Sequence, residues 1–250
     1  MSSSGGSKNK FKRERAQMRA DTKALFDDIK GPLLQGLGLA LRKPVTKNEA
    51  AEWVHHDLDK FNRAFLKLFA PSFFSGLRAK QGIDEAAFCA SMSNEQWTSD
   101  GTRGNSGSVL FSTADRHFFI KSISKREYEL YEKIWPKLKE KMMSGTSFLP
   151  PVVCLFVENT HDNIGYLVMK NLFLGISGPA FDLKGRKRTM AAGMTTGRDD
   201  EFVADFPGGI ILEKRDRDQL LSKLQADIKI FVFVDVILYM GLILLAVICK

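Results

Sequence analysis

The residues from Gly104 to Lys121 constrain this chain more than any other stretch, because a glycine-rich turn there runs into strand-like sequence ending in one lysine. Gly104 and Gly107 bracket small polar residues, so the backbone can approach a phosphate group and offer unhindered N–H donors. The hydroxyls of Ser106 and Ser108 are available as further donors. The pattern is typical of a loop that holds the phosphates of a nucleotide.

Two strands are expected after the glycine turn, at residues 109–112 and 117–120, with a tight turn at 114–116 between them. Lys121 then follows the second strand, where its ammonium group is a point charge suited to the α- and β-phosphate oxygens of a nucleotide. The alternative interpretation is an ordinary hairpin whose lysine faces water, because a glycine pattern alone is a weak signal.

Composition narrows the class of protein. The chain has 250 residues, of which 44% are hydrophobic, so it can bury one core with a small appendage. Its three cysteines lie far apart and suggest neither a disulfide framework nor a zinc site, and a reducing cytoplasmic setting is expected. The net charge of +8 calls for an acidic partner, such as an anionic membrane. Nucleic acid is not expected, since no motif for binding it is present.

Basic residues concentrate in two segments, 8–19 and 184–188. The first belongs to residues 1–48, which are expected to form a flexible basic arm, and a solvated tail is the simplest interpretation of its charge. The second could equally be a solvated loop.

Several segments resemble the phosphatidylinositol phosphate kinase family and occur in that family's order. They lie at residues 69–84, 106–108, 119–121, 124–130, 148–151, 168–172 and 181–185. The resemblance covers roughly residues 61–227 and implies an α+β fold, a kinase-like N-lobe of antiparallel sheet and helices with the C-lobe largely absent. The kinase-like domain is expected at residues 49–227, followed by an apolar segment at 228–250. ATP and Mg²⁺ are the implied cofactors, and a phosphoinositide membrane is the implied partner.

The resemblance also implies site residues. Two further strands are expected at residues 152–157 and 165–169. Met169, Asn171 and Leu172 fall where the family has its hinge, which would contact the adenine ring. The alternative interpretation of these three residues is a plain strand end. Asp182 and Lys184 match the family's signature at the nucleotide cleft, but Arg186 replaces its serine.

The clearest helix is expected at residues 125–143, with Ser124 and Glu127 forming a capping box and Pro136 kinking or dividing it. In kinases a glutamate of this helix pairs with the strand lysine. Because Glu127 is engaged in the cap, Glu129 is the favoured partner of Lys121; the alternative is that both glutamates are solvated.

Apolar residues spaced by about four between Glu49 and Phe69 predict an amphipathic helix that ends at Pro71, with a second helix at 73–81 stopped by Gly82. The resemblance implies a homodimer through these 49–81 helices.

The resemblance weakens towards the C-terminal end. The helix expected at 220–227 continues it, but the family's catalytic Met-Asp-Tyr-Ser-Leu-Leu motif falls on residues 237–242, where Leu238 replaces the aspartate. Leucine cannot accept a proton from the attacking hydroxyl. Taken alone, residues 230–249 form an apolar run long enough to span a bilayer, so a C-terminal membrane anchor competes with a buried segment.

Three hypotheses follow for the function. The chain is an ATP-binding phosphoinositide kinase that is incomplete or inactive alone, since it stops before the family's metal-binding aspartate; or a non-catalytic pseudokinase; or a tail-anchored membrane scaffold that keeps a kinase-like N-lobe.

Overall fold

The computed structural model describes residues 37–38, 40–41, 53–57, 65–94, 96–99, 108–149, 151–159, 164–176, 178–183, 185, 187, 189, 196–232 and 242–244. Two compact units share them. The first unit comprises Met1–Glu132 with Pro150–Asn171, and the second comprises Lys133–Leu149 with Leu172–Lys250. The helices and strands of both units give the α+β class that the sequence predicts.

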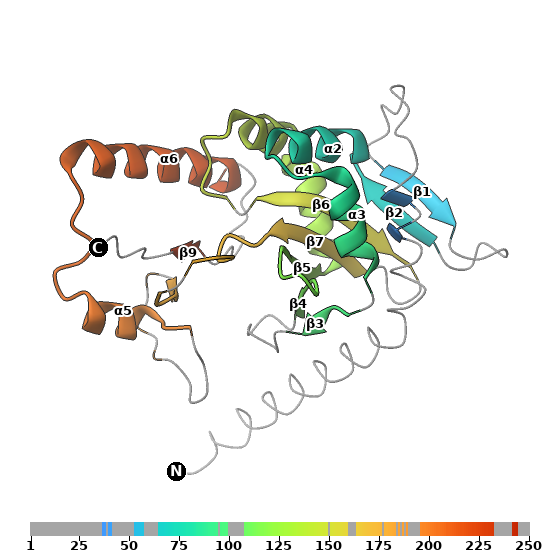
Figure 1. Ribbon diagram of the computed structural model, residues 1–250. Coiled ribbons are helices and arrows are strands. Elements are labelled where there is room, and N and C mark those ends of the chain that lie inside the picture. Colours follow the sequence, from blue (N-terminus) through green and yellow to red (C-terminus); the bar gives the residue numbers. More distant parts are fainter. Residues whose placement is uncertain are drawn as a thin grey trace, which may run out of the picture. The chain divides into compact units, whose positions relative to one another are not determined.

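The first unit is built on a seven-stranded antiparallel sheet in the order β1-β2-β6-β7-β5-β4-β3 (Figure 1). The strands are β1 Trp53–Asp57, β2 Phe65–Phe69, β3 Thr98–Ser99, β4 Leu110–Ser112, β5 Phe118–Ile123, β6 Val152–Glu158 and β7 Ile164–Lys170. β6 is buried along its whole length, as its run of apolar residues predicts for a central strand. The strands expected on both sides of the 114–116 turn, and those expected at 152–157 and 165–169, are confirmed.

The helix predicted between Glu49 and Phe69 is wrong, because the described part of this segment forms β1 and β2. A spacing of four residues is also a multiple of the strand period of two, so it fits both structures. In β2, Leu66 and Leu68 are buried whereas Phe65 and Lys67 are only partly buried, which is the alternation of a strand. Of the two helices expected to form the dimer interface, only the second is present in the described residues, at 71–80. Dimerisation of the chain stays a prediction.

Two helices follow β2, namely α2 Pro71–Lys80 and α3 Glu85–Ser93. Pro71 begins α2 at its first turn, where a missing N–H costs nothing. Gly82 adopts a positive φ of 68°, and the N–H groups of Gly82 and Ile83 donate to the carbonyls of Ala79 and Arg78. This pattern is a Schellman motif, so Gly82 ends the helix as the sequence predicts.

α3 crosses one face of the sheet (Figure 1) and closes the core. Its Phe88 ring meets the Phe118 ring of β5 edge to face at 5.1 Å between centroids. The buried core on this face draws on α3 and six of the strands or the residues beside them: Leu66, Leu68, Phe88, Met92, Trp97, Val109, Phe111, Phe118, Ile120, Val153, Cys154, Phe156, Tyr166 and Val168.

A buried arginine ties α2 to the sheet. Arg78 is 2% exposed, and its Nη1 donates to the carbonyl of Val153 in β6 at 2.8 Å. Its Nε and Nη2 donate to Glu85 at the start of α3, and its guanidinium lies 4.3 Å from the centroid of the Phe88 ring. A bidentate ion pair of this kind holds two helices and one strand in a fixed register.

The helix α4 spans Lys125–Ser144, and its first turns lie against the face of the sheet opposite the α3 core. Its capping box is confirmed, and the helix continues through Pro136. A Cβ placed on Gly165 of β7 would lie 2.8 Å from Cγ1 of Ile123 and 3.0 Å from Cδ1 of Tyr128 in α4. Glycine at this position therefore lets α4 approach the sheet closely.

A second contact fixes α4 at the edge of the sheet. The indole Nε1 of Trp53 in β1 donates to Glu132 at 2.5 Å, and the Trp53 ring lies 6.0 Å from the ring of Tyr128. The first turns of α4 are thus held at the centre of the sheet by Tyr128 and at its edge by Glu132.

The second unit contains α5 Asp199–Asp205, α6 Lys214–Val232 and a two-stranded antiparallel sheet of β8 Phe181–Leu183 and β9 Leu242–Leu244. The rings of Phe181, Phe202 and Phe206 pack together, with centroids 5.1 to 5.8 Å apart. The helix predicted at 220–227 is confirmed within α6, which runs through the predicted domain boundary at residue 227.

Most of the apolar C-terminal run lies outside the described residues, including Asp235 and Leu238. Within the part of the chain that the structure describes, no helix combines the length and the hydropathy needed to cross a bilayer. The membrane anchor stays a prediction.

Replacing Gly165 with alanine should destabilise the fold by about 1–3 kcal/mol, because the new methyl group overpacks against Ile123 and Tyr128. Urea unfolding measures the change. Gly76→Ala is the matched control: Gly76 is exposed within α2 and a Cβ there meets nothing within 4 Å, so this variant should gain up to about 1 kcal/mol. A Gly165→Ala variant as stable as the parent would contradict the close packing of α4 on β7.

Candidate nucleotide-binding site

Lys121 lies in the middle of the sheet. It is part of β5, where it pairs with Leu110 of β4 on one side and Leu167 of β7 on the other. Alternate residues of β5 enter the α3 core, as Phe118 and Ile120 do, so Lys121 points to the face that α4 occupies. Its side chain is 33% exposed, which leaves the ammonium group accessible from solvent.

The partner of Lys121 is Glu127 and not Glu129, which corrects the sequence-based expectation. The Lys121 Nζ lies 4.0 Å from Oε1 of Glu127, whereas Glu129 lies 3.8 Å from Lys125. Two residues along a helix point to nearly opposite sides, so only one of the two glutamates can face the strand.

The capping role of Glu127 does not prevent this pairing, because its carboxylate has two oxygens. Oε2 accepts hydrogen bonds from the backbone N–H of Ser124 at 2.7 Å and from its hydroxyl at 2.9 Å. Oε1 is left to face Lys121. The cap therefore orients the ion pair, because the two oxygens of one carboxylate can serve two different partners.

The exit of the glycine-rich turn is anchored beside Lys121. Gly104, Ser106 and Gly107 lie outside the described residues, and Ser108 is the first residue of the turn that the structure describes. The next residue, Val109, is buried, and its N–H donates to Oγ of Ser122 at 2.8 Å. The Ser122 N–H donates in return to the Val109 carbonyl at 2.9 Å. Because Ser122 follows Lys121 directly, Val109 is held next to the lysine in the sheet.

The predicted hinge coincides with the border between the two units, which falls between Asn171 and Leu172. Met169 is the second-last residue of β7, paired with Phe119 of β5 and Val152 of β6. Leu172 is 50% exposed. A chain that leaves a sheet at the end of a central strand and enters a second unit is the arrangement expected of a hinge.

Asn171 has a structural role that the sequence did not reveal. Its N–H donates to the His117 carbonyl at 2.8 Å, and its side-chain Nδ2 donates to the Arg116 carbonyl at 2.7 Å. Arg116 adopts a left-handed backbone conformation with φ of 59°, so Asn171 stabilises the strained turn between β4 and β5.

The remaining predicted residues belong to the second unit. Asp182 is the central residue of β8, and its N–H donates to the Gly197 carbonyl at 2.9 Å. Lys184 lies outside the described residues, while its neighbour Gly185 donates its N–H to Asp199 at 2.8 Å. Within the described residues, no group of three or more His, Cys, Asp or Glu side chains could hold a metal ion.

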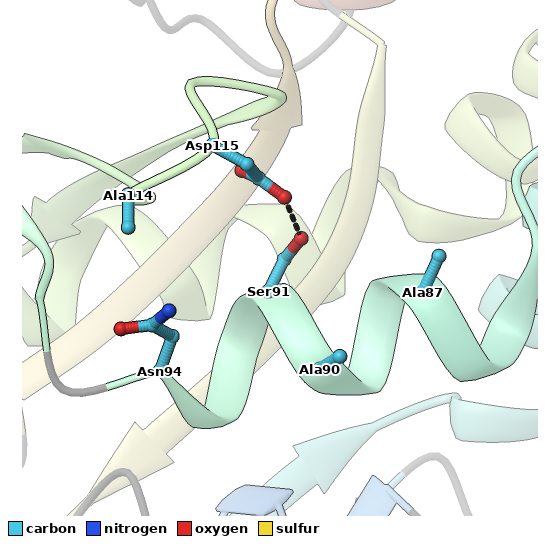
Figure 2. A pocket seen from close by; sticks show the side chains of 6 residues that line it. All are labelled: Ala87, Ala90, Ser91, Asn94, Ala114 and Asp115. Atoms are coloured by element: carbon cyan, nitrogen blue, oxygen red, sulfur yellow. Dashed lines mark hydrogen bonds between the residues drawn. The ribbon is translucent and has the colours of Figure 1, made fainter.

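A hollow of about 270 Å³ lies between α3 and the β4–β5 turn (Figure 2). It is on the α3 face of the sheet, opposite to the face towards which Lys121 points. Figure 2 shows the carboxylate of Asp115 turned towards the hydroxyl of Ser91 on α3, which donates a hydrogen bond to it. Asp115 also accepts hydrogen bonds from Oγ1 of Thr113 at 2.5 Å and from the N–H of His117 at 3.1 Å. The cluster fixes the turn on α3 and has the character of a structural contact.

These hydrogen bonds change the acidity of Asp115. Partial burial, the largest single influence, acts to raise its pKa, but the bonds from Ser91, Thr113 and His117 together outweigh it and hold the pKa below its ordinary value.

An antiparallel sheet with a central lysine and a capped helix that supplies its carboxylate define a kinase-like N-lobe. The chain belongs to the phosphatidylinositol-4-phosphate 5-kinase family, whose model matches residues 91–246.

Three relatives illustrate the similarity. The chain is 27% identical over 184 residues to phosphatidylinositol 4-phosphate 5-kinase type-1 sktl of Drosophila melanogaster, covering 69% of this chain and 23% of that protein. It is 25% identical over 184 residues to the human type-1 alpha enzyme, covering 69% and 32%. It is 24% identical over 190 residues to the type-1 beta enzyme of Gallus gallus, covering 70% and 35%. The matched region is thus about a quarter to a third of the length of these relatives.

Replacing Asp115 with asparagine should destabilise the protein in a pH-dependent way. A carboxyl whose pKa is lowered by folding contributes stability above its unfolded pKa, near 4, and loses that contribution as pH falls through the folded pKa. The difference in unfolding free energy between parent and Asp115→Asn should therefore be largest at neutral pH and shrink below about pH 4. Urea unfolding at several pH values tests this, with the exposed Asp218→Asn as control; a difference independent of pH would contradict the assignment.

Proposed function

We propose that this chain binds ATP through its first unit and is the nucleotide-holding part of a phosphoinositide kinase. The observation that carries the proposal is the Lys121–Glu127 pair, set beside the exit of the glycine-rich turn at Val109 and Ser122. In kinases this combination holds the α- and β-phosphates while the hinge receives the adenine ring.

Each group has a defined task in this proposal. The Lys121 ammonium binds phosphate oxygens, and Glu127 keeps the lysine side chain on the α4 face of the sheet. The turn containing Gly104, Ser106 and Gly107, together with Ser108, covers the phosphates with backbone N–H groups.

The other contacts come from the two ends of the hinge. Met169 and Leu172 supply apolar surface for the adenine ring, and Asn171 shapes the hinge by holding the β4–β5 turn. The resemblance to the family supports a further proposal, that Asp182 and Lys184 contact the nucleotide. ATP would arrive as its magnesium complex, as in kinases generally.

The lipid substrate is proposed from the relatives, which are named as kinases of phosphatidylinositol 4-phosphate. A net charge of +8 favours association with an anionic membrane surface, where each basic residue near the lipid contributes on the order of 1 kcal/mol. We therefore propose a phosphoinositide membrane as the partner of this chain.

A second candidate function is that of a non-catalytic pseudokinase. The resemblance of the sequence to the family places Leu238 where the family has its catalytic aspartate, and this expectation supports the second candidate. A hydrocarbon side chain neither accepts a proton nor orients a hydroxyl, so the chain would not transfer the γ-phosphoryl group. Such a pseudokinase binds nucleotide weakly or not at all and acts through its basic surface or its N-terminal helices.

The nucleotide site is tested by thermal unfolding with and without magnesium-ATP. Ligand at about 100 times its Kd stabilises a protein by about 2.7 kcal/mol, so the parent should show a clear rise in Tm. Lys121→Met should abolish the rise, and Glu127→Gln should raise the Kd about two- to fivefold, since the pair is partly exposed. Glu129→Gln is the matched control and should behave as the parent does. An unchanged Tm rise in Lys121→Met would show that ATP binds elsewhere or unspecifically.

The choice between kinase and pseudokinase is tested with vesicles containing phosphatidylinositol 4-phosphate and radiolabelled magnesium-ATP. With leucine at position 238, transfer to the lipid should not exceed that of the Lys121→Met variant. Co-sedimentation of the chain with the same vesicles is the control that it reaches the lipid. Transfer that depends on Lys121 would overturn the pseudokinase reading and would place the catalytic base at another residue.

A further inference from the structure

The indole of Trp53 reaches the first turns of α4 from the far edge of the sheet. Its Nε1 donates to Oε1 of Glu132 at 2.5 Å, and its ring lies 6.0 Å from the ring of Tyr128. The ring of Phe69 in β2 packs on the indole at 4.9 Å between centroids. Because the acceptor is a carboxylate, the hydrogen bond is of the stronger, charge-assisted kind. All four residues belong to the first unit.

Trp53 and Lys121 lie on the same face of the sheet but on different strands. Trp53 is paired with Phe69, and Phe69 follows Leu68 of the α3 core, so both rings point to the face opposite α3. Lys121 points to that face too, since it follows Ile120 of the same core. β2, β6 and β7 separate β1 from β5, which corresponds to about 19 Å across the sheet. Both residues belong to the first unit, and α4 connects them.

α4 presents one side to these strands. Glu127 faces Lys121, and Glu132, five residues later, accepts the hydrogen bond from Trp53. This step is about 7.5 Å of helix, and the long side chains at both ends span the remaining distance. Tyr128 lies between the two contacts and packs on β7. Contacts to β5, β7 and β1 therefore come from one side of the first two turns.

The Trp53 contact determines the tilt of α4. The Lys121–Glu127 pair has a separation of 4.0 Å and each side chain is 33% exposed, so this pair is too weak to hold a helix. The packing of Tyr128 on β7 fixes the rotation of the helix, but a single contact leaves the helix axis free to tilt. The hydrogen bond from Trp53 is a second contact on another strand, and two contacts fix the axis.

We propose that Trp53 is a positioning residue for the nucleotide site: by holding the first turns of α4 it keeps Glu127 beside Lys121. Trp53 precedes residues 91–246, which match the family's model, so the pair within the matched region depends on a strand outside it. The inference rests on the proposed function only for its consequence, weaker nucleotide binding. The geometric part is open to test without any nucleotide.

The first measurement is zero-length crosslinking with a water-soluble carbodiimide, which joins a carboxylate to an amine only when the two groups are in contact. In the parent, an amide should form between Lys121 and Glu127, and tandem mass spectrometry of the linked peptide locates it. Trp53→Phe keeps a ring beside Phe69 and Tyr128 but removes the N–H donor. It should lower the yield by up to about fivefold, the factor by which a partly exposed ion pair is favoured over its separated form. Absence of the amide from the parent would overturn the proposal as well.

An internal control lies within α4. Lys125 and Glu129 pair at 3.8 Å, so the same reagent should join them. Because both residues belong to one helix, the yield of their crosslink should be the same in Trp53→Phe as in the parent. A fall in both crosslinks would show that α4 itself loosens, and would overturn the positioning role.

Trp97→Phe is the matched variant for general loosening of the fold. The Trp97 Nε1 donates to the carbonyl of Ser91 at 3.3 Å, and the Trp97 ring belongs to the α3 core. The variant therefore removes an indole donor from the opposite face of the sheet and should leave the Lys121–Glu127 crosslink unchanged. Equal losses of this crosslink in Trp97→Phe and Trp53→Phe would contradict a specific role of Trp53.

Glu132 provides a second route to the same test. Glu132→Ala removes the acceptor and should lower the Lys121–Glu127 yield as Trp53→Phe does, and combining both changes should lower it no further. Glu132→Gln keeps an acceptor oxygen for the indole and should retain most of the yield. If Trp53→Phe fails to fold, Glu132→Ala and Glu132→Gln decide the question.

The Kd for magnesium-ATP is measured on the same variants by calorimetry. Trp53→Phe should raise the Kd by no more than Glu127→Gln does, and the double variant should bind as Glu127→Gln alone does. An effect of Trp53→Phe on the Kd that persists in the Glu127→Gln background overturns the inference. So does an unchanged crosslink in both Trp53→Phe and Glu132→Ala.

Failure of the inference and failure of the proposed function give different results. If the crosslink responds as expected but Lys121→Met leaves ATP binding unchanged, Trp53 positions the pair and the proposed function fails. If Lys121→Met abolishes ATP binding while Trp53→Phe leaves both the crosslink and the Kd unchanged, only the inference fails.

Discussion

The close approach of α4 to β7 at Gly165 is the contact on which the candidate site depends. Without a side chain at this position, the Tyr128 ring can pack on the sheet beside Ile123. That packing fixes the rotation of α4, and the rotation decides which side chains of its first turn face β5. The meeting of Lys121 and Glu127 is therefore a consequence of packing, because an ion pair between two partly exposed side chains is too weak to orient a helix by itself.

The two faces of the sheet have separate roles. The face covered by α3 holds most of the buried apolar side chains of the first unit. The guanidinium of Arg78 in α2 connects that helix to the start of α3 and to β6. The α4 face carries Lys121. Neighbouring residues of β5 point to opposite faces of the sheet, so Ile120 packs in the core whereas Lys121 places its charge on the other face. A functional side chain can thus lie at the centre of the sheet without interrupting the core.

The sequence was most informative where a structure depends on nearby residues. The capping box at Ser124 and Glu127, the Schellman end at Gly82 and the strands on both sides of the β4–β5 turn follow from local hydrogen bonding and alternation, and all were predicted. The segment now seen as β1 and β2 was misassigned, because its apolar spacing suited both helix and strand and its true partner, β6, lies some ninety residues away.

The sequence alone determined the family of the chain, the order of its central strands along the chain and the position of Lys121 after a glycine-rich turn. These features depend on the types of residues that lie close together in the sequence. Only the tertiary structure decided that Glu127 faces the lysine and that Asn171 stabilises the β4–β5 turn. Each of those choices depends on which groups distant in the chain meet in space. A carboxylate or an amide can form hydrogen bonds with several different partners, and its neighbours in space decide which partner it has. The local sequence does not specify those neighbours.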